Sequence, residues 1–279
     1  MSLKKTVSKT GETMIWDTFI FFNELEILEI RLNTLDKFVD KFVIVEAVRK
    51  HSGEPKPLYY NENKLEFKKF RDKIVHVVVD DIPTNPDFWI AENFQRNAIS
   101  RGLVRADPND IILVSDVDEI PRPEKFELIK PTGITIFLMD YYVYYLNRRS
   151  PDEPIWTLGT RAVHFKEMTT PQETRLYGCR REPIGNKYAI FNGGWHFSYL
   201  GGEAKVLEKI MTCPDRQLVG THPSDNMIQN KILIQQGKDP MGWRTNQAWN
   251  YTPIDFTFPQ YVIDNQEYFS DIILKEKRA

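Results

Sequence analysis

The residues best suited to chemistry in this chain are three carboxylates that follow a short apolar run. Asp116, Asp118 and Glu119 come after the Ile-Ile-Leu-Val-Ser run at 111–115, and Pro121 ends the motif. The run is too short for a helix and is typical of a buried parallel strand, whose carboxyl end is where open α/β sheets bind ligands. Residues two apart in an extended segment project to the same side. We therefore expect Asp116 and Asp118 to converge on one hard cation, Mn²⁺ or Mg²⁺, able to hold a diphosphate.

Other interpretations of this acidic motif fit the surrounding residues less well. An EF-hand calcium loop requires a preceding helix and a glycine at its sixth position, where this chain has Pro121. A phosphohydrolase would use Asp116 as a nucleophile at a strand end, although this strand is not the first of the chain. A solvated acidic loop, with Asp116 capping a turn, is the non-catalytic interpretation.

Composition narrows the class of protein. The 279 residues are 41% hydrophobic and carry a net charge of −2, so they can form one large core but present no general basic field. We therefore expect no nucleic-acid partner. Two cysteines, Cys179 and Cys213, lack a C-x-x-C spacing and favour a reducing compartment. Because the sequence shows no long apolar run, we expect no transmembrane segment and a cytoplasmic location.

Aromatic residues are abundant, with 17 Phe, 12 Tyr and 6 Trp. Aromatic rings stack on the apolar faces of sugars as well as on each other. The surplus is therefore compatible with carbohydrate binding, including binding by a non-catalytic protein, and core packing explains most of it equally well.

Alternating strand and helix patterns surround the acidic motif. Strands are predicted at residues 16–22, 41–46, 74–79 and 111–115, and helices at residues 25–35, 59–70 and 88–104. Four strands joined by three crossovers describe a doubly wound, Rossmann-like half. The predicted fold class is α/β, with a mostly parallel central sheet and flanking helices.

The second half of the chain has a different pattern. Strands are predicted at residues 134–146, 156–165 and 188–199, and helices at residues 203–211, 225–236 and 266–275. The sequence contains no internal repeat, and no low-complexity linker lies between the two halves. We predict a flexible tail at residues 1–14 and one domain at residues 15–279, with a nucleotide-binding half at 15–121 and an acceptor half at 122–279.

A set of ordered motifs resembles glycosyltransferase family 17. They are Phe-Ile-Phe-Phe-Asn-Glu at 19–24, Glu-x-Arg-Leu at 29–32, Asp-Lys-Phe-Val-Ile-Val-Glu-Ala at 40–47, Ser-Gly-Glu-Pro-Lys-Pro-Leu at 52–58, Asp-Val-Asp-Glu-Ile-Pro at 116–121 and Gly-Gly-Trp-His-Phe-Ser at 193–198. The resemblance extends from about Trp16 to Leu274. It implies a GT-A fold, a nucleotide-sugar donor, a glycan acceptor and an inverting mechanism.

The metal site follows from the acidic motif together with this resemblance. Asp118 is predicted as a direct metal ligand, and the GT-A pattern implies that Asp116 lies nearer the ribose or binds a metal-bound water. Glu119 either orients the site or faces solvent. The resemblance implies that His196 reaches the metal or the diphosphate, and imidazole suits Mn²⁺ better than Mg²⁺. The alternative for His196 is a histidine bonded to a backbone carbonyl inside an aromatic cluster.

Donor contacts are expected at the carboxyl ends of the first two strands. Asn23, Glu24 and Glu46 are predicted there, with helix capping the alternative for Asn23 and a salt bridge the alternative for Glu46. Arg96, in the helix before the acidic strand, is predicted to reach a phosphate.

Inversion requires a general base that takes the proton of the acceptor hydroxyl. Asp140 and Glu203 are the preferred candidates, and Asp225 is a third that alternatively caps a helix. The sequence thus favours a metal-dependent inverting glycosyltransferase that uses a UDP-sugar to form a β linkage on an oligosaccharide, the sugar being N-acetylglucosamine, xylose or a similar one. A metal-dependent phosphohydrolase and a non-catalytic carbohydrate-binding protein remain the alternatives.

Overall fold

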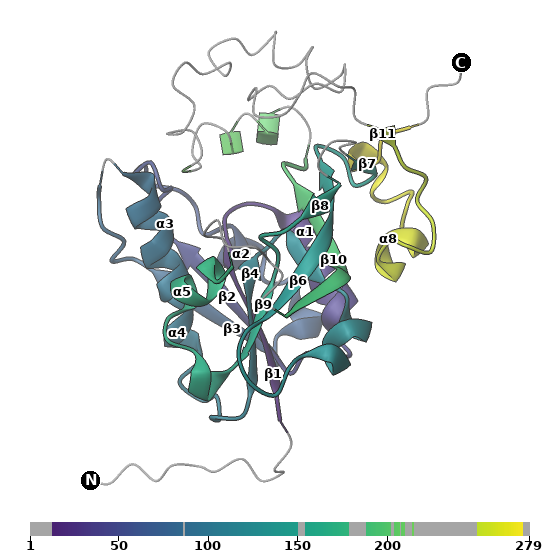
Figure 1. Ribbon diagram of the computed structural model, residues 1–279. Coiled ribbons are helices and arrows are strands. Elements are labelled where there is room, and N and C mark those ends of the chain that lie inside the picture. Colours follow the sequence, from purple (N-terminus) through teal and green to yellow (C-terminus); the bar gives the residue numbers. More distant parts are fainter. Residues whose placement is uncertain are drawn as a thin grey trace, which may run out of the picture.

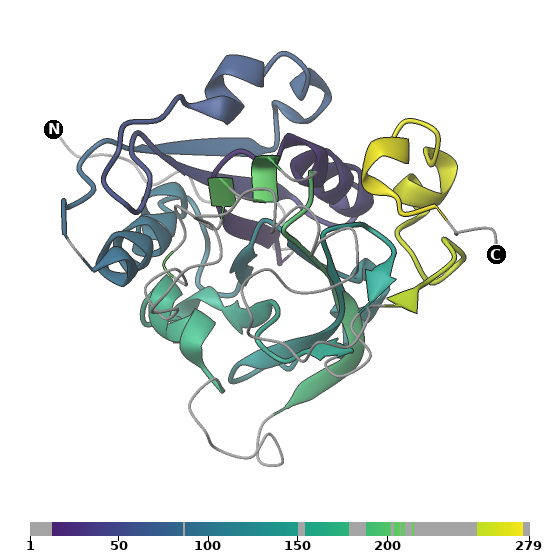
Figure 2. The same ribbon diagram turned by 90° about the horizontal axis from the view of Figure 1, so that it is seen from above.

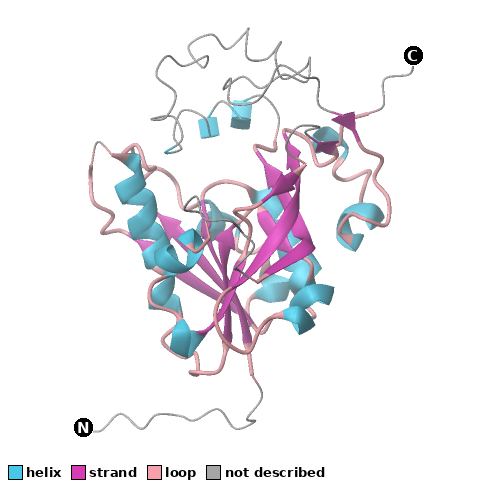
Figure 3. Cartoon of the chain, viewed as in Figure 1, coloured by secondary structure: helices cyan, strands magenta, loops and turns pink. Residues whose placement is uncertain are grey.

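The computed structural model describes residues 13–85, 87–149, 154–178, 188–201, 204–206, 208–209, 214 and 250–275. These residues contain one mixed sheet of 11 strands with helices on both of its faces (Figures 1 and 3). The strands are β1 (Ile15–Phe21), β2 (Lys41–Ala47), β3 (Ile74–Val79), β4 (Ile111–Asp116), β5 (Glu119–Pro121), β6 (Thr135–Val143), β7 (Arg148–Arg149), β8 (Ile155–Trp156), β9 (Arg161–His164), β10 (Ala189–Ser198) and β11 (Asn250–Tyr251).

Helices connect and cover these strands. The α-helices are α1 (Leu25–Leu35), α2 (Tyr59–Asn63), α3 (Phe88–Asn97), α4 (Ile99–Gly102), α5 (Pro171–Leu176) and α8 (Gln260–Asp264). The 3₁₀ helices are η1 (Lys68–Phe70), η2 (Pro123–Leu128), η3 (Phe165–Glu167) and η7 (Ser270–Ile272). Seen from above, α1 and the C-terminal helix α8 lie side by side (Figure 2). None of the helices in the described ranges is long and apolar enough to cross a membrane.

The first four strands form the parallel part of the sheet. Their spatial order is β3-β2-β1-β4, and each neighbouring pair is parallel. This order is the first half of a Rossmann-type sheet. The predicted α/β class and Rossmann-like arrangement are confirmed, and they are compatible with a GT-A fold.

Alternate side chains of β2 point to opposite faces of the sheet. Phe42 and Ile44 pack in the cluster that contains helix α1, while Val43 and Val45 pack in the cluster that contains α3 and α4. All four are fully buried. A strand buried on both faces reads as a continuous apolar run, which is why this strand is predictable from the sequence.

Strand β10 makes the junction that carries the acidic motif. It pairs parallel with β6 and antiparallel with β5, so that His196 lies opposite both Glu119 and Tyr141. A Cβ added to Gly194 would clash with the carbonyl oxygen of Ile120. Glycine at this position therefore allows the backbones of β10 and β5 to approach closely.

Two predicted helices differ from the structure. In the segment 59–70, helix α2 ends at Asn63 and a 3₁₀ turn follows, because the buried rings Phe67 and Phe70 are three residues apart, the spacing that a 3₁₀ helix aligns. The predicted helix at 266–275 is wrong: only η7 forms there. The side chain of Asn147 bonds both the N–H (2.7 Å) and the carbonyl (2.9 Å) of Leu274, which holds that backbone outside a helix.

Two further predicted helices lie wholly or partly outside the described residues. Residues 204–206 and 208–209, within the predicted helix 203–211, are helical. The predicted helix at 225–236 lies outside the described residues.

Candidate active site

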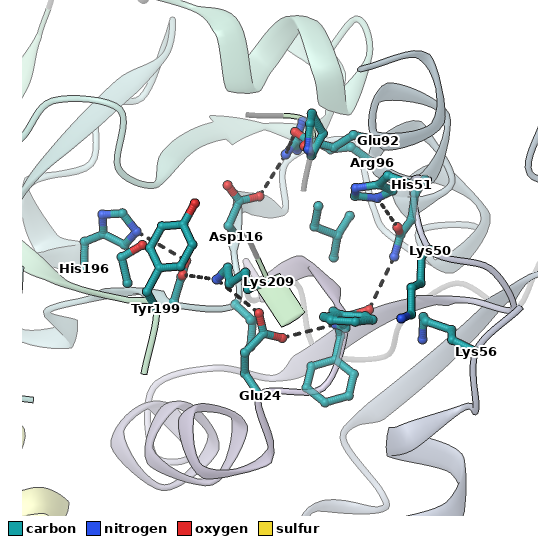
Figure 4. Close-up of a pocket in the computed structure, with 18 of the residues that line it drawn as sticks. Glu24, Lys50, His51, Lys56, Glu92, Arg96, Asp116, His196, Tyr199 and Lys209 are labelled. Atoms are coloured by element: carbon teal, nitrogen blue, oxygen red, sulfur yellow. Dashed lines mark hydrogen bonds and ion pairs between the residues drawn. The ribbon is translucent and has the colours of Figure 1, made fainter. Parts of the chain in front are cut away.

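A cleft of about 400 Å³ lies at the carboxyl ends of the parallel strands. Small-molecule sites span about 300–1,000 Å³. Its walls come from the end of β1 (Ile20, Phe21, Phe22), helix α1's start (Glu24), the loop after β2 (Arg49, Lys50, His51, Lys56), α3 (Glu92, Gln95, Arg96), the acidic turn (Asp116, Val117, Asp118), the β6, β8 and β10 region (Tyr141, Trp156, His196, Ser198, Tyr199) and Lys209 and Pro214. Figure 4 shows Asp116, His196 and Lys209 on one side of this cleft, and Lys50, His51 and Lys56 on the other.

The backbone of the acidic turn is held by a buried arginine of helix α1. The guanidinium of Arg31 donates to the carbonyl oxygens of Asp116 (3.0 Å), Val117 (3.1 Å) and Glu119 (2.8 Å). It also forms a bidentate pair with Asp17 of β1, at 2.7 and 2.6 Å. Both Arg31 and Asp17 are fully buried. This network fixes the turn, and thereby the direction in which its side chains project.

Two arginines hold the carboxylate of Asp116. Arg96 donates to Oδ1 at 2.9 Å and Arg175 donates to Oδ2 at 3.1 Å. Burial alone would raise the pKa of Asp116, but the two guanidinium groups outweigh burial and hold it well below its usual value. Asp116 is therefore ionised, with both oxygens engaged.

Glu119 is an internal carboxylate rather than a solvent-facing one. It is fully buried. Its Oε1 accepts from Trp156 Nε1 (2.7 Å) and from Arg175 (2.6 Å), and its Oε2 accepts from the backbone N–H of Asp116 (3.1 Å). Burial raises the pKa of Glu119, with Arg175 opposing. Of the two predicted alternatives, the structure places Glu119 as a group that orients the site.

Asp118 lies on the wall of the cleft between a histidine and a lysine. Its Oδ1 is 3.5 Å from His196 Nε2, and its Oδ2 accepts from Lys209 Nζ at 2.9 Å. Lys209 Nζ also donates to Glu24 at 3.2 Å. Burial raises the pKa of Asp118, but the charge of Lys209 and then His196 outweigh burial and lower it. The same carboxylates raise the pKa of Lys209 against its own burial.

The imidazole of His196 lies in an aromatic cluster. Its ring stacks on Tyr141, with centroids 4.9 Å apart, and also contacts Trp156 at 4.5 Å. Its Nδ1 is buried, and no group of the described residues forms a hydrogen bond with it. The predicted alternative of a histidine bonded to a backbone carbonyl is therefore not what the structure shows.

The metal-binding side chains in the cleft suit a divalent cation whose remaining ligands are supplied by the substrate. Within the described residues, no group of three or more His, Cys, Asp or Glu side chains is arranged to hold a metal. Asp118 and His196 nevertheless offer one carboxylate and one imidazole on the same wall. Mg²⁺ sites use one or two carboxylates with substrate phosphates and water, and imidazole also suits Mn²⁺. A cation held by these residues would thus depend on a phosphorylated ligand.

The predicted donor residues divide into two groups. Glu24 and Arg96 line the cleft, whereas Asn23 and Glu46 do not. The alternative role of Asn23, capping the helix that follows, is wrong. Glu24 is the N-cap residue of α1, and Asn23 Nδ2 donates to Glu208 at 3.0 Å. Glu46 is fully buried and accepts from the Tyr60 backbone (3.0 Å) and from His76 (3.1 Å), so it is a structural carboxylate.

Of the candidate general bases, only Asp140 lies among the described residues, and it is outside the cleft. Its oxygens pair with Arg149 at 2.6 Å and Arg122 at 3.4 Å. Glu203 and Asp225 lie outside the described residues.

Several residues of the site are not predicted from the sequence. Lys209 and Arg175 are separated from the acidic turn by 91 and 59 residues and reach it through long side chains. Arg31 leaves a signal, because Asp17 interrupts a buried apolar strand and a buried carboxylate requires a partner.

Comparison with known proteins assigns the chain to a family. The model of glycosyltransferase family 17 matches residues 3–200. The rat and human proteins named beta-1,4-mannosyl-glycoprotein 4-beta-N-acetylglucosaminyltransferase are each 32% identical over 287 aligned positions, which cover 88% of this chain and 52% of the relative. The mouse protein of the same name is 31% identical over the same shares. The chain thus spans about half the length of these curated relatives. Since the family model covers well over half of the sequence, the chain belongs to glycosyltransferase family 17.

Proposed function

We propose that this chain is a metal-dependent inverting glycosyltransferase that moves a sugar from a UDP-sugar to a glycan acceptor. The observation that carries the proposal is the pair of Asp118 and His196 on one wall of a cleft at the carboxyl ends of parallel strands. Family membership supports the same activity, and the names of the relatives favour N-acetylglucosamine as the sugar and a mannose-containing glycan as the acceptor. A cytoplasmic location and a single domain stay predictions.

The side chains of the acidic turn have distinct parts in this mechanism. Asp118 and His196 would hold the cation, which would neutralise the leaving diphosphate as a Lewis acid. Asp116 is kept ionised by Arg96 and Arg175, and these two ion pairs hold its carboxylate in place within the acidic turn. Because these groups are already oriented by buried contacts, little reorganisation is needed when charge develops on the leaving group.

The geometry is less favourable to the two alternatives. A phosphohydrolase needs a free oxygen on Asp116 for attack on phosphorus, but both of its oxygens accept from arginines. A non-catalytic sugar-binding protein would not require the oriented carboxylates of the acidic turn. For the general base, Glu203 and Asp140 stay predictions, and the ion pairs of Asp140 make it the weaker candidate.

The stereochemistry of the product tests the proposed reaction. We expect a panel of α-linked UDP-sugars, offered with Mn²⁺ and mannose-containing oligosaccharides, to yield a β-glycoside, because direct displacement inverts the anomeric carbon. The linkage is read from the NMR coupling constant of the new anomeric proton. An α-linked product would overturn inversion, and phosphate release without any acceptor would favour the phosphohydrolase.

Lys209 is predicted to compete with the metal for Asp118. Its ammonium group lies 2.9 Å from Asp118 Oδ2, where it neutralises the carboxylate that the cation needs. Lys209→Met should therefore tighten Mn²⁺ binding by about tenfold, as expected for the loss of one close like charge. Lys205→Met is the matched control, because Lys205 pairs with Glu26 and does not line the cleft. Equal Mn²⁺ affinities in the wild type and the Lys209 variant, measured by calorimetry in the presence of UDP, would contradict this competition.

A further inference from the structure

The wall of the cleft opposite the acidic turn contains a histidine with a defined hydrogen-bonding face. His51 follows strand β2 and lines the cleft with Phe22 and Gln95. Figure 4 shows it across the cleft from Asp116 and His196. If the metal and diphosphate lie at the acidic turn, the base of the nucleotide extends toward this wall.

Gln95 has only one orientation that satisfies its buried contacts. Its side chain is 4% exposed, and its Nε2 donates to the carbonyl oxygens of Val45 (2.9 Å) and Phe21 (3.4 Å). A flipped amide would direct its oxygen at these two carbonyls. The amide oxygen Oε1 must therefore face away from them, toward His51.

This orientation fixes the tautomer of His51. Gln95 Oε1 lies 2.9 Å from His51 Nε2 and can only accept, so Nε2 carries a hydrogen. Burial lowers the pKa of His51, with Glu92 opposing, which favours the neutral ring. The other nitrogen, Nδ1, is then a hydrogen-bond acceptor. Within the described part of the chain, the His51 ring forms its hydrogen bond with Gln95.

We propose that His51 Nδ1 accepts the N3–H of a uracil base and thereby selects UDP-sugars over CDP-sugars. The inference rests on the proposed function, which it deepens by assigning a residue that determines base specificity. Uracil presents a donor at N3, whereas cytosine presents an acceptor there, so a cytosine base would face His51 lone pair to lone pair. The ring of Phe22 lines the same cleft and offers apolar surface to the face of a base.

Gln95 is a positioning residue in this proposal. It does not touch the base but holds the His51 tautomer that can accept from it. A site built around one fixed acceptor rejects a ligand without the matching donor, because the buried group is then left unpaired.

Calorimetry with UDP and CDP in the presence of Mn²⁺ tests the assignment, because the two ligands carry the same diphosphate. We expect the wild-type protein to bind UDP at least about tenfold more tightly than CDP. His51→Gln should reduce this ratio to about threefold or less, since a glutamine amide can rotate to offer either a donor or an acceptor. The matched control is His164→Gln. His164 lies on strand β9, forms a hydrogen bond with the carbonyl of Asn109 and does not line the cleft.

The possible outcomes distinguish failure of the His51 assignment from failure of the proposed function. Equal binding of UDP and CDP by the wild type, or an unchanged ratio in the folded His51 variant, would overturn the role of His51 while leaving nucleotide binding intact. Failure of the wild type to bind either nucleotide would overturn the proposed function together with the role of His51. Thermal melting of each variant confirms that the compared proteins are folded.

Discussion

Replacing Asp118 with asparagine is expected to lower sugar transfer by about 10²- to 10³-fold, the effect typical of losing one electrostatic group at a reacting centre. The amide is a much weaker ligand for a hard cation than the carboxylate. The fold should persist, because Lys209 keeps its ion pair with Glu24 when the charge of Asp118 is removed. The rate of transfer and the affinity for UDP in Mn²⁺ are the quantities to measure.

A matched control for this substitution is Asp81→Asn. Asp81 also pairs with a basic residue, Arg101, but on the surface and outside the cleft. Its loss should leave transfer unchanged. Full activity of the Asp118 variant, or of the wild type in excess chelator, would show that the cation is not held as proposed.

Replacing Arg31 with methionine is expected to lower the free energy of unfolding by about 3–5 kcal/mol, as for the removal of one partner from a buried ion pair. Methionine fills a similar volume but leaves Asp17 charged, buried and unpaired. It also removes the donor to the carbonyls of Asp116, Val117 and Glu119. Urea denaturation measures the loss.

The comparison variant is Arg101→Met. The side chains of Arg101 and Asp81 are 41% and 54% exposed, so their ion pair is screened by water and its loss should change the free energy of unfolding far less. If Arg31→Met were no more destabilising than Arg101→Met, the buried network would not be what holds the acidic turn.

The parallel strands and the position of the acidic motif are predictable because both depend on local patterns. Strand β2 is apolar on both faces, and the acidic motif begins with Asp116, the last residue of β4. The convergence of Asp118 and His196 is predictable only through the family motifs, since the pairing of β10 with β5 that brings them together is not a local property.

The parts of the site that escape prediction depend on tertiary contacts of long side chains. Arg175 lies in a segment that reads as basic and solvated, yet its guanidinium is buried against Asp116 and Glu119. Glu46 reads as a nucleotide ligand from its place at a strand end, but a backbone N–H and His76 occupy its carboxylate. Which partner a carboxylate finds is decided by packing that the sequence pattern does not encode.

Calorimetric titration of the wild-type protein with UDP, in Mn²⁺ and again in excess chelator, shows whether a cation is needed for the nucleotide to bind in the cleft. Asp118 and His196 supply only part of a cation's coordination shell, so metal and diphosphate should bind together in the cleft. We expect saturable UDP binding in Mn²⁺ that weakens by at least about tenfold when the metal is removed. UDP binding of equal strength with and without the metal, or no binding in either condition, would contradict this expectation.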